Sequence, residues 1–484
     1  MEMNVPVLNR IDATTWEIPR TGGMRVPGRI IANEELLKPI LHDKAAEQVA
    51  NVAWLPGIVA YSMAMPDAHW GYGFPIGGVA ATDPAEGGVI SPGGVGYDIN
   101  CGCRVMTTAL EYSAVKDRMH DIVAGLYRDI PAGVGSQGAI PKLSESEMRR
   151  VLNEGAHWAV SRGYGTPEDL DATEDHGRIE TADAGAVSAR ALARGENQVG
   201  TLGSGNHFAE VGVIERVFDS EIAEAYGLRE GFITVMIHSG SRGLGYQVCD
   251  DFVQKMLRAA QKYGITLPDR QLCCAPVESP EGREYISAMS AAANYAWANR
   301  QIMMELARRS IQHMLRIKPE ELQGRLLYDV CHNIAKMETH IVDGRARRLC
   351  VHRKGATRAF PGTRPEVLER YRSVGQPVLI PGDMGTGSYV CAGTQTALEK
   401  TFGSCCHGAG RRLSRKAASK AKDPATLMRE LEAKGIVVMA RSKRTLTEES
   451  PEAYKDIDAV ADVVAESGIG RKVARIRPVG VIKG

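Results

Sequence analysis

Five short segments of the 484-residue sequence contain side chains that could bind a metal ion or attack phosphorus. Four carry a histidine among small polar residues, and the fifth has an aspartate three residues before a cysteine; they are residues 203–208, 237–243, 331–336, 406–411 and 96–102. Imidazole, thiolate and carboxylate together form a ligand set for a divalent transition ion. A single histidine beside glycine is more often part of a turn or a core, and spacing over hundreds of residues does not show convergence. The motifs alone therefore leave a metal site and a purely structural role open.

Glycines and basic residues near these histidines indicate phosphate binding. Residues 407–410 read His-Gly-Ala-Gly, and backbone N–H groups in such loops bind anions. They lead into residues 411–422, which hold six basic side chains and no acid, and residues 345–358 hold six more. Either run could be a solvated surface, but their position beside the histidine segments favours a track for a nucleic-acid backbone.

Two common nucleotide-binding signatures are absent from the sequence. There is no Gly-Lys dipeptide, which excludes a standard P-loop, and no Lys-x-Asp-Gly, the signature of a nucleotidyl-lysine. A covalent nucleotidyl intermediate would therefore need another nucleophile. Histidine is chemically suited, because imidazole attacks phosphorus readily.

The elements that must position these segments are a mixture of helices and strands. The hydrophobic pattern predicts an amphipathic helix over residues 31–50, a long helix over 284–316 and a peripheral helical insertion at about 115–200. Residues 65–104 are typical of short strands and tight loops, and residues 233–238 and 435–440 of buried strands. No regular βαβ rhythm appears, so we expect a mixed α+β or irregular α/β fold.

Composition narrows the class of protein. The chain is 44% hydrophobic and 24% charged with a formal net charge of +1, which is ordinary for a globular protein with a large core. Ten cysteines in so long a chain do not indicate a disulfide framework, and we expect reduced thiols. We identify no signal peptide and no apolar run long enough to span a membrane, so we expect a cytoplasmic protein.

Seven segments, in order from residue 65 to the C-terminus, closely resemble the RtcB family of RNA ligases. They are residues 65–78 (Met-Pro-Asp-Ala-His-Trp-Gly-Tyr-Gly-Phe-Pro-Ile-Gly-Gly), 96–101, 205–208, 238–243, 332–333, 407–411 and 480–484. Trp70 is the one departure, because the family has a polar residue there; it could stack on an RNA base or be a structural tryptophan. The resemblance implies one large α/β domain over residues 1–484 with a deep metal and nucleotide cleft.

The resemblance also implies a ligand set and a nucleophile. Asp98, Cys101, His207, His238 and His332 match a site for two Mn²⁺ ions bridged by the Cys101 thiolate, and His407 matches the histidine that is guanylylated by GTP. The residues that match the GTP pocket are Asn206, Phe208, Glu210, Asn333, Pro381, Gly382, Asp383, Met384, Ser388, Gly408, Ala409, Gly410, Tyr454 and Lys483. Glu210 is suited to accept hydrogen bonds from guanine, which adenine does not offer. Arg242, Lys354 and Arg411 match basic residues near RNA phosphates.

The implied activity is ligation of an RNA 3′-phosphate or 2′,3′-cyclic phosphate end to a 5′-hydroxyl end, in tRNA splicing or RNA repair. An archease activator and a monomeric state are further expectations. Two alternatives stay open. A two-metal phosphoesterase would use the metal ligands without His407, and a non-enzymatic RNA-binding protein would use only the basic runs.

Overall fold

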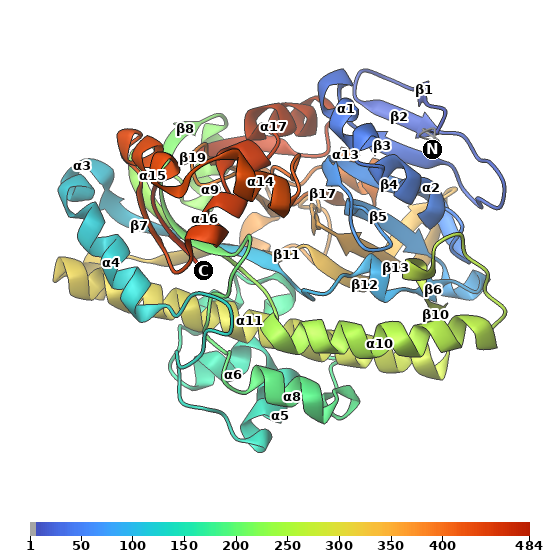
Figure 1. The fold of residues 1–484 in the computed structure, drawn as a ribbon, viewed down its shortest axis with the longest axis horizontal. Coiled ribbons are helices and arrows are strands. Elements are labelled where there is room, and N and C mark those ends of the chain that lie inside the picture. The colour runs from blue at the N-terminus through green and yellow to red at the C-terminus, as the bar shows by residue number, and fades with distance from the viewer. Residues whose placement is uncertain (1–5) are drawn as a thin grey trace.

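The computed structural model describes residues 6–484, and in this part of the chain two large β-sheets carry most of the strands (Figure 1). The seven-stranded sheet has the order β1 (Asn9–Arg10), β2 (Thr15–Ile18), β3 (Gly28–Ile31), β4 (Ile58–His69), β5 (Ile76–Thr82), β13 (Arg345–Lys354) and β12 (Asn333–Val342). The eight-stranded sheet includes β11 (Arg325–Cys331), β7 (Gly102–Glu111), β9 (Phe232–Ser239), β8 (Phe208–Val217), β19 (Arg471–Lys483), β16 (Ser388–Ala392) and β15 (Pro377–Ile380), in that order, with β18 (Val437–Ala440) parallel to β19. Helices and strands alternate irregularly, which confirms the expected mixed α/β fold.

The two sheets meet where one chain segment passes from one to the other. β11 ends at Cys331 in the eight-stranded sheet, and β12 starts at Asn333 in the seven-stranded sheet. Only His332 separates them, so this histidine lies at the junction. The short pair β14 (Ala356–Arg358) and β17 (Ser404–Cys406) follows the same junction and places residue 407 beside it.

Two long helices, α10 (Arg242–Lys262) and α11 (Pro280–Leu315), run side by side along the sheets (Figure 1). α11 covers the predicted helix over residues 284–316 except for Arg316, and every residue from Ala288 to Met304 is buried. The predicted helical region at 115–200 follows α3 (Tyr112–Val115) and contains α4 (Met119–Asp129), α5 (Glu145–Glu154), α6 (Ala156–Ser161), α7 (Pro167–Leu170) and α8 (Ala189–Gly195). In Figure 1, α5, α6 and α8 lie on the side of α10 and α11 that faces away from the sheets.

Smaller helices complete the described chain. They are α1 (Glu34–His42), α2 (Ala45–Val52), α9 (Ser220–Tyr226), α12 (Pro319–Leu322), α13 (Gln395–Thr401), α14 (Arg415–Ala421), α15 (Pro424–Ala433), α16 (Lys443–Glu448) and α17 (Ile457–Glu466). None of the helices within residues 6–484 combines the length and apolar character needed to cross a bilayer.

Two sequence predictions about elements are wrong in detail. The helix expected over residues 31–50 is α1 and α2, separated by Lys44, whose φ of +67° lies in the left-handed region that interrupts a helix. The amphipathic stripe continues through this break, so periodicity does not reveal it. The strand expected at 435–440 starts only at Val437, and as β18 it is a partly buried strand beside β19 rather than a buried central strand.

Candidate active site

Strand register brings four of the five candidate metal ligands together at the ends of neighbouring strands in the eight-stranded sheet. β7 is antiparallel to both β9 and β11, with Gly102 opposite Ser239 and Cys331. β8 is antiparallel to β9, with Phe208 opposite His238. Because antiparallel neighbours place the start of one strand beside the end of the next, the residues at or beside these ends converge: Cys101, His207, His238 and His332. Segments separated by hundreds of residues therefore form one cluster.

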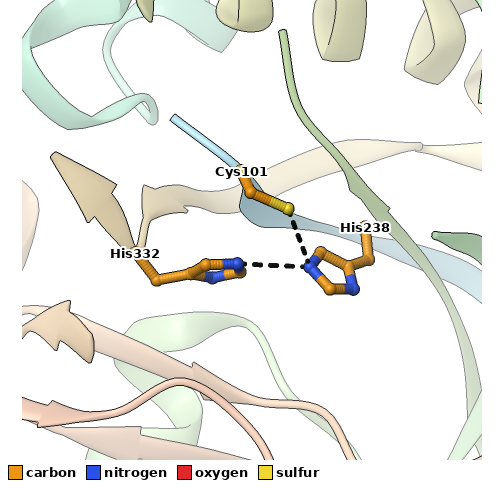
Figure 2. Close-up of side chains that lie close together, drawn as sticks. All are labelled: Cys101, His238 and His332. Carbon is orange, nitrogen blue, oxygen red and sulfur yellow. Dashed lines mark hydrogen bonds between the residues drawn. The ribbon is translucent and has the colours of Figure 1, made fainter. Parts of the chain in front are cut away.

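The ligand atoms form two triads that share one thiol. Cys101 Sγ lies 3.2 Å from His238 Nε2, which lies 3.2 Å from His332 Nε2 (Figure 2). On the other side, Cys101 Sγ lies 3.5 Å from His207 Nε2, which lies 2.8 Å from Asp98 Oδ2. Within each triad all ligand atoms lie within 4.8 Å of one another. Each triad could hold one metal ion, with Cys101 common to both.

The electrostatics of the cluster suit a divalent cation. Burial lowers the pKa of His238 and His332 well below the usual value, so both imidazoles are neutral and offer lone pairs. Burial and the adjacent Asp98 raise the pKa of the Cys101 thiol well above its usual value. Burial would also raise the pKa of Asp98, but the charge and hydrogen bond of His207 outweigh it and bring that pKa to about 2. A thiolate at Cys101 thus requires a compensating positive charge, and the donor set fits a borderline metal ion.

His407 directly follows β17 and is held by a carboxylate that the sequence reasoning did not identify. Its Nδ1 lies 2.6 Å from Asp67 Oδ2, and its backbone N–H donates to the same oxygen at 3.1 Å. The His407 ring packs edge to face on His332, with ring centroids 4.7 Å apart. Asp67 is fully buried on β4. Asp67 lies inside the 65–78 segment, and that motif was the only feature of the sequence that pointed to it.

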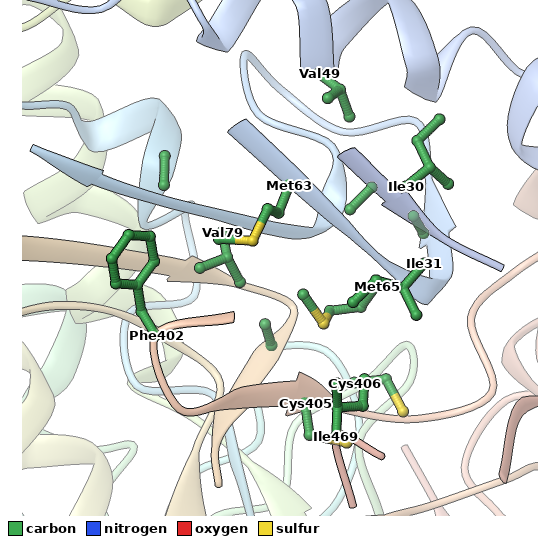
Figure 3. Close-up of a cluster of buried hydrophobic side chains, with 14 of the residues drawn as sticks. Ile30, Ile31, Val49, Met63, Met65, Val79, Phe402, Cys405, Cys406 and Ile469 are labelled. Carbon is green, nitrogen blue, oxygen red and sulfur yellow. The ribbon is translucent and has the colours of Figure 1, made fainter. Parts of the chain in front are cut away.

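One hydrophobic cluster anchors the two strands that carry this pair. Cys405 and Cys406 of β17 are buried in it together with Met65 of β4 (Figure 3). Lys455 also holds the backbone of β4, because its buried Nζ donates to the carbonyls of Ala68 at 2.6 Å and Pro66 at 3.2 Å. The backbone around Asp67 is therefore fixed from two sides. All ten cysteines are free thiols, as expected.

Four of the five triad residues and His407 line one cavity of about 310 Å³. The predicted residues that line it are Asp98, Cys101, Asn206, Phe208, Glu210, His238, His332, Asn333, Lys354, Pro381, Gly382, Asp383, Met384, His407, Gly408, Ala409, Gly410, Arg411, Tyr454 and Lys483. Three predicted residues do not line it. His207 lies behind the others as part of the second triad, Ser388 accepts from the Gly382 N–H at 3.2 Å, and Arg242 contacts Thr201 and Ser136 beside the His207 loop.

Glu210 is a buried carboxylate with free hydrogen-bonding capacity. It is 3% exposed, and its Oε1 has no partner within the described chain. Burial and the nearby Asp383 raise the pKa of Glu210 to about 8. Asp383 itself accepts from Gly385 N and from the Thr386 hydroxyl, so its carboxylate stabilises its own turn. Unlike Asp383, Glu210 therefore has a carboxylate oxygen available to accept from a ligand with N–H donors.

Three basic side chains surround one buried carboxylate, that of Glu449, in another part of the cavity wall. Glu449 is fully buried, and Arg411 (3.1 Å), Arg415 (3.6 Å) and Lys483 (3.9 Å) approach its carboxylate. The Tyr454 hydroxyl also contacts it. Three cations on one anion leave a positive excess, which suits an anionic ligand. No motif in the sequence indicates Glu449.

The basic run at 345–358 does not form one surface track, contrary to the sequence prediction. Arg353 is buried and ion-paired with Glu338, and Arg358 is buried and ion-paired with Glu174. Along β13 successive side chains point to opposite faces, so one run serves different sites. Of its basic residues, Lys354 lines the cavity; its Nζ donates to the backbone of Tyr72 and Phe74, and burial lowers its pKa to about 7.

Trp70 is 46% exposed and lies next to His69, which lines the cavity. Its backbone N–H donates to the Asp43 carboxylate at 2.9 Å, whereas no hydrogen bond within the described residues holds its indole. This exposure argues against the buried structural role weighed for Trp70.

Comparison with known proteins gives a consistent result along the chain. A family model described as tRNA-splicing ligase RtcB matches residues 48–484. A protein named tRNA-splicing ligase RtcB from Thermococcus kodakarensis is 53% identical over 478 residues, covering 99% of each chain. One of the same name from Aeropyrum pernix is 52% identical, covering 98% of this chain and 99% of its own. An RNA-splicing ligase RtcB from Mycobacterium tuberculosis is 50% identical, covering 90% of this chain and 100% of its own. Every candidate site residue lies within the range that the family model matches.

Proposed function

Because this chain belongs to the RtcB family, we propose that it is an RNA ligase that joins 3′-phosphate or 2′,3′-cyclic phosphate ends to 5′-hydroxyl ends. GTP supplies the energy, and RNA ends from tRNA splicing or RNA damage are the substrates. The observation that carries this proposal is the His407–Asp67 pair at 2.6 Å, with His407 in the cavity beside the metal-ligand triads. A two-metal phosphoesterase could use such a histidine as a general acid but would form no covalent nucleotide on it.

Two Mn²⁺ ions are the proposed cofactors, one held by Cys101, His238 and His332 and the other by Asp98, Cys101 and His207. When bound, Mn²⁺ supplies positive charge that neutralises phosphate oxygens during displacement at phosphorus. The backbone carbonyl of Leu202 lies 3.0 Å from His207 Nδ1, so this nitrogen carries the proton and Nε2 is left as the ligand.

His407 is the proposed nucleophile, and Asp67 sets its tautomer. A proton on Nδ1 is donated to the Asp67 carboxylate, so Nε2 keeps the lone pair that attacks. Nε2 forms a bond to the α-phosphorus of GTP, the bond to the β-phosphate oxygen breaks, and pyrophosphate leaves. The substituted ring becomes cationic, and the adjacent Asp67 carboxylate stabilises that charge.

The following steps return His407 to its starting state. A 2′,3′-cyclic phosphate end is first hydrolysed to a 3′-phosphate. An oxygen of the RNA 3′-phosphate then attacks the guanylate phosphorus, and the imidazole leaves with its Nδ1 proton still shared with Asp67. The 5′-hydroxyl of the second RNA end finally attacks the RNA 3′-phosphorus, a phosphodiester forms, and GMP leaves.

Glu210 is the proposed guanine selector. An ionised carboxylate accepts from guanine N1–H and from the 2-amino group, whereas adenine offers no such pair of donors. Phe208 and Met384 supply apolar surface beside it, and the other predicted pocket residues complete the nucleotide site. The cationic group around Glu449 gives the triphosphate a favourable potential.

The raised pKa of Glu210 predicts a specific pH dependence of GTP binding. Below pH 8 the free protein holds Glu210 mainly protonated, and guanine binding must displace that proton. GTP affinity should therefore rise up to about tenfold per pH unit between pH 6 and 8 and level off above. In Glu210→Gln this rise should disappear, and GTP affinity should fall about 10–100-fold with little change for ATP. Nucleotide titrations of both proteins across this range measure the effect; an identical pH slope in both would remove Glu210 from guanine recognition.

RNA is the proposed macromolecular partner, with Arg242, Lys354 and Arg411 near its reacting phosphates. A groove between α14 and α16 extends from the cavity through Arg415 and is lined by Lys416, Lys443 and Arg444. This groove is a suitable continuation for a phosphodiester backbone. Lys416→Ala with Lys443→Ala should weaken RNA binding and its salt dependence while leaving guanylylation of His407 unchanged; a loss of both would point to misfolding instead.

The experiment that tests the activity uses two RNA oligonucleotides, one ending in a 2′,3′-cyclic phosphate and one beginning with a 5′-hydroxyl. With GTP and Mn²⁺ we expect a joined product, and with ATP in place of GTP we expect none. End hydrolysis without joining would favour the phosphoesterase. We further propose that the chain acts as a single domain, is monomeric and cytoplasmic, and is stimulated by an archease. Gel filtration tests the monomeric state, and addition of an archease to the joining assay tests stimulation.

A further inference from the structure

Two adjacent side chains of the buried helix α11 reach the backbone beside the candidate metal ligands. Asn299 and Arg300 are both fully buried, and neither contacts a ligand side chain directly. Both donate to Ser239, and their other hydrogen bonds reach different segments. The proposed reaction gives neither residue a role, and no feature of the sequence singled them out.

Arg300 connects the three elements that carry the Cys101–His238–His332 triad. Its guanidinium donates to Asn100 O at 2.7 Å and to Ser239 O at 2.9 Å, which are the residues next to Cys101 and His238. It also forms a two-pronged ion pair with Asp329, at 2.8 and 2.9 Å, on the strand that ends before His332. One planar group therefore holds the backbone beside Cys101 and His238 and a side chain of the strand that leads to His332.

Backbone strain beside Cys101 shows that this contact has a positioning effect. Asn100 has a φ of +52°, in the left-handed region that favours glycine. Arg300 donates to the side-chain oxygen of Asn100 at 2.9 Å, and the Asn100 amide donates to Ala293 O of the same helix at 2.7 Å. Such a conformation persists only where its surroundings hold it. α11 thus imposes the turn that presents the Cys101 thiol.

Asn299 makes the corresponding contacts to the Asp98–Cys101–His207 triad. Its Oδ1 accepts from Gly200 N at 2.7 Å and Thr201 N at 3.0 Å, in the loop whose Leu202 carbonyl fixes His207 Nδ1. Its amide nitrogen donates to Gly240 O at 3.1 Å. The next residue, Ser241, donates its backbone N–H to Asp98 Oδ1 at 3.0 Å. Both ligands that are specific to this triad are therefore reached from Asn299.

We propose that Asn299 and Arg300 are positioning residues with different reach. Asn299 holds the ligands specific to the Asp98–Cys101–His207 triad, whereas Arg300 holds the Cys101–His238–His332 triad and, through the shared Cys101, contributes to the other triad as well. This inference rests on the proposed two-metal centre. Groups behind the ligands tune metal affinity by fixing ligand orientation, and their loss costs about 10–100-fold in affinity. Two neighbouring residues on one helix thereby couple both metal positions to the core.

α11 provides a matched control of the same residue type. Asn294 is also fully buried and makes a comparable set of hydrogen bonds, but to Leu152 O and to the backbone of Ile179 in the peripheral helical region. Asn294→Ala and Asn299→Ala should therefore lower the melting temperature similarly. Only Asn299→Ala should change metal binding.

The test measures equilibrium Mn²⁺ binding, from the EPR signal of free Mn²⁺, in two backgrounds that each leave one triad intact. In His207→Ala, which retains the first triad, Arg300→Lys should weaken Mn²⁺ binding about 10–100-fold, and Asn299→Ala less than about threefold. In His332→Ala, which retains the second, Asn299→Ala should have the large effect, and Arg300→Lys a smaller one than in His207→Ala, because only Cys101 of this triad depends on Arg300. Asn294→Ala should change neither. Arg300→Lys retains the charge that Asp329 requires, and Asn299→Ser replaces the alanine variant if that one does not fold.

The outcomes separate this inference from the proposed metal centre. If the unmodified protein does not bind two Mn²⁺ ions, or His207→Ala and His332→Ala do not each remove one, the metal centre itself is wrong. If they do, but Asn299→Ala weakens both positions equally or neither, or Arg300→Lys does not weaken the first position more than the second, the positioning roles are wrong. A loss confined to the second position in Asn299→Ala, with the larger loss at the first position in Arg300→Lys, supports them.

Discussion

Asp67→Asn is expected to slow guanylylation of His407 by about 10²–10⁴-fold, which corresponds to about 3–5 kcal/mol of activation free energy. The carboxylate can only accept, so it keeps the His407 proton on Nδ1 and leaves Nε2 free to attack. An asparagine amide can donate to Nδ1 instead, which moves the proton to Nε2 and removes the nucleophile. It also cannot stabilise the cationic ring that forms. The rate of label transfer from α-labelled GTP to the protein measures the effect.

Asp43→Asn is the matched control for this variant. Asp43 is a neighbouring carboxylate that accepts from Trp70 N and Ala45 N and does not touch His407. Its replacement should leave the labelling rate within about threefold of normal. The role of Asp67 would be refuted if Asp67→Asn labelled at the normal rate, or if both variants slowed it equally.

Cys101→Ser is expected to lower Mn²⁺ affinity at both positions by at least about 100-fold and to abolish RNA joining. Cys101 is the one side chain common to both triads, so its loss differs from that of any histidine, which should affect mainly one position. A serine hydroxyl is far less acidic than a thiol and does not supply an anionic bridge at neutral pH. Equilibrium dialysis against Mn²⁺ gives the number of ions bound and their affinities.

Cys103→Ser controls for the insertion of a hydroxyl into this strand. Cys103 lies two residues further along, is also fully buried and belongs to the hydrophobic core rather than to a triad. Its replacement should reduce the melting temperature while leaving two Mn²⁺ ions bound. Normal Mn²⁺ binding by Cys101→Ser would contradict a shared thiolate ligand.

Sequence alone could identify candidate metal ligands, because each lies in a short polar segment next to a predicted strand or loop. It could not show that they meet. That depends on antiparallel register, which sets Gly102 opposite both Ser239 and Cys331 through pairings with β9 and β11. Local pattern predicts that a strand exists, whereas its partner is set by contacts far away in sequence. The family resemblance supplied what spacing did not.

The residues that sequence reasoning missed act through partners distant in the chain. Lys455 reaches carbonyls near residue 67, and Glu449 gathers Arg411, Arg415 and Lys483. Neither lies in a recognisable motif. Lys455 bonds to backbone carbonyls, which place little constraint on local sequence, and Glu449 pairs with side chains from other segments. Arg353 illustrates the opposite error: it belongs to a basic run but is buried against Glu338, so charge pattern alone assigned it to the surface.

The most direct test of the central claim is covalent labelling of the protein with α-labelled GTP in the presence of Mn²⁺. We predict one labelled protein species that is lost in His407→Ala, and a bond with the acid lability of a phosphoramidate. RNA with a 3′-phosphate should discharge the label. Absence of labelling, or labelling that persists in His407→Ala, would contradict guanylylation of His407.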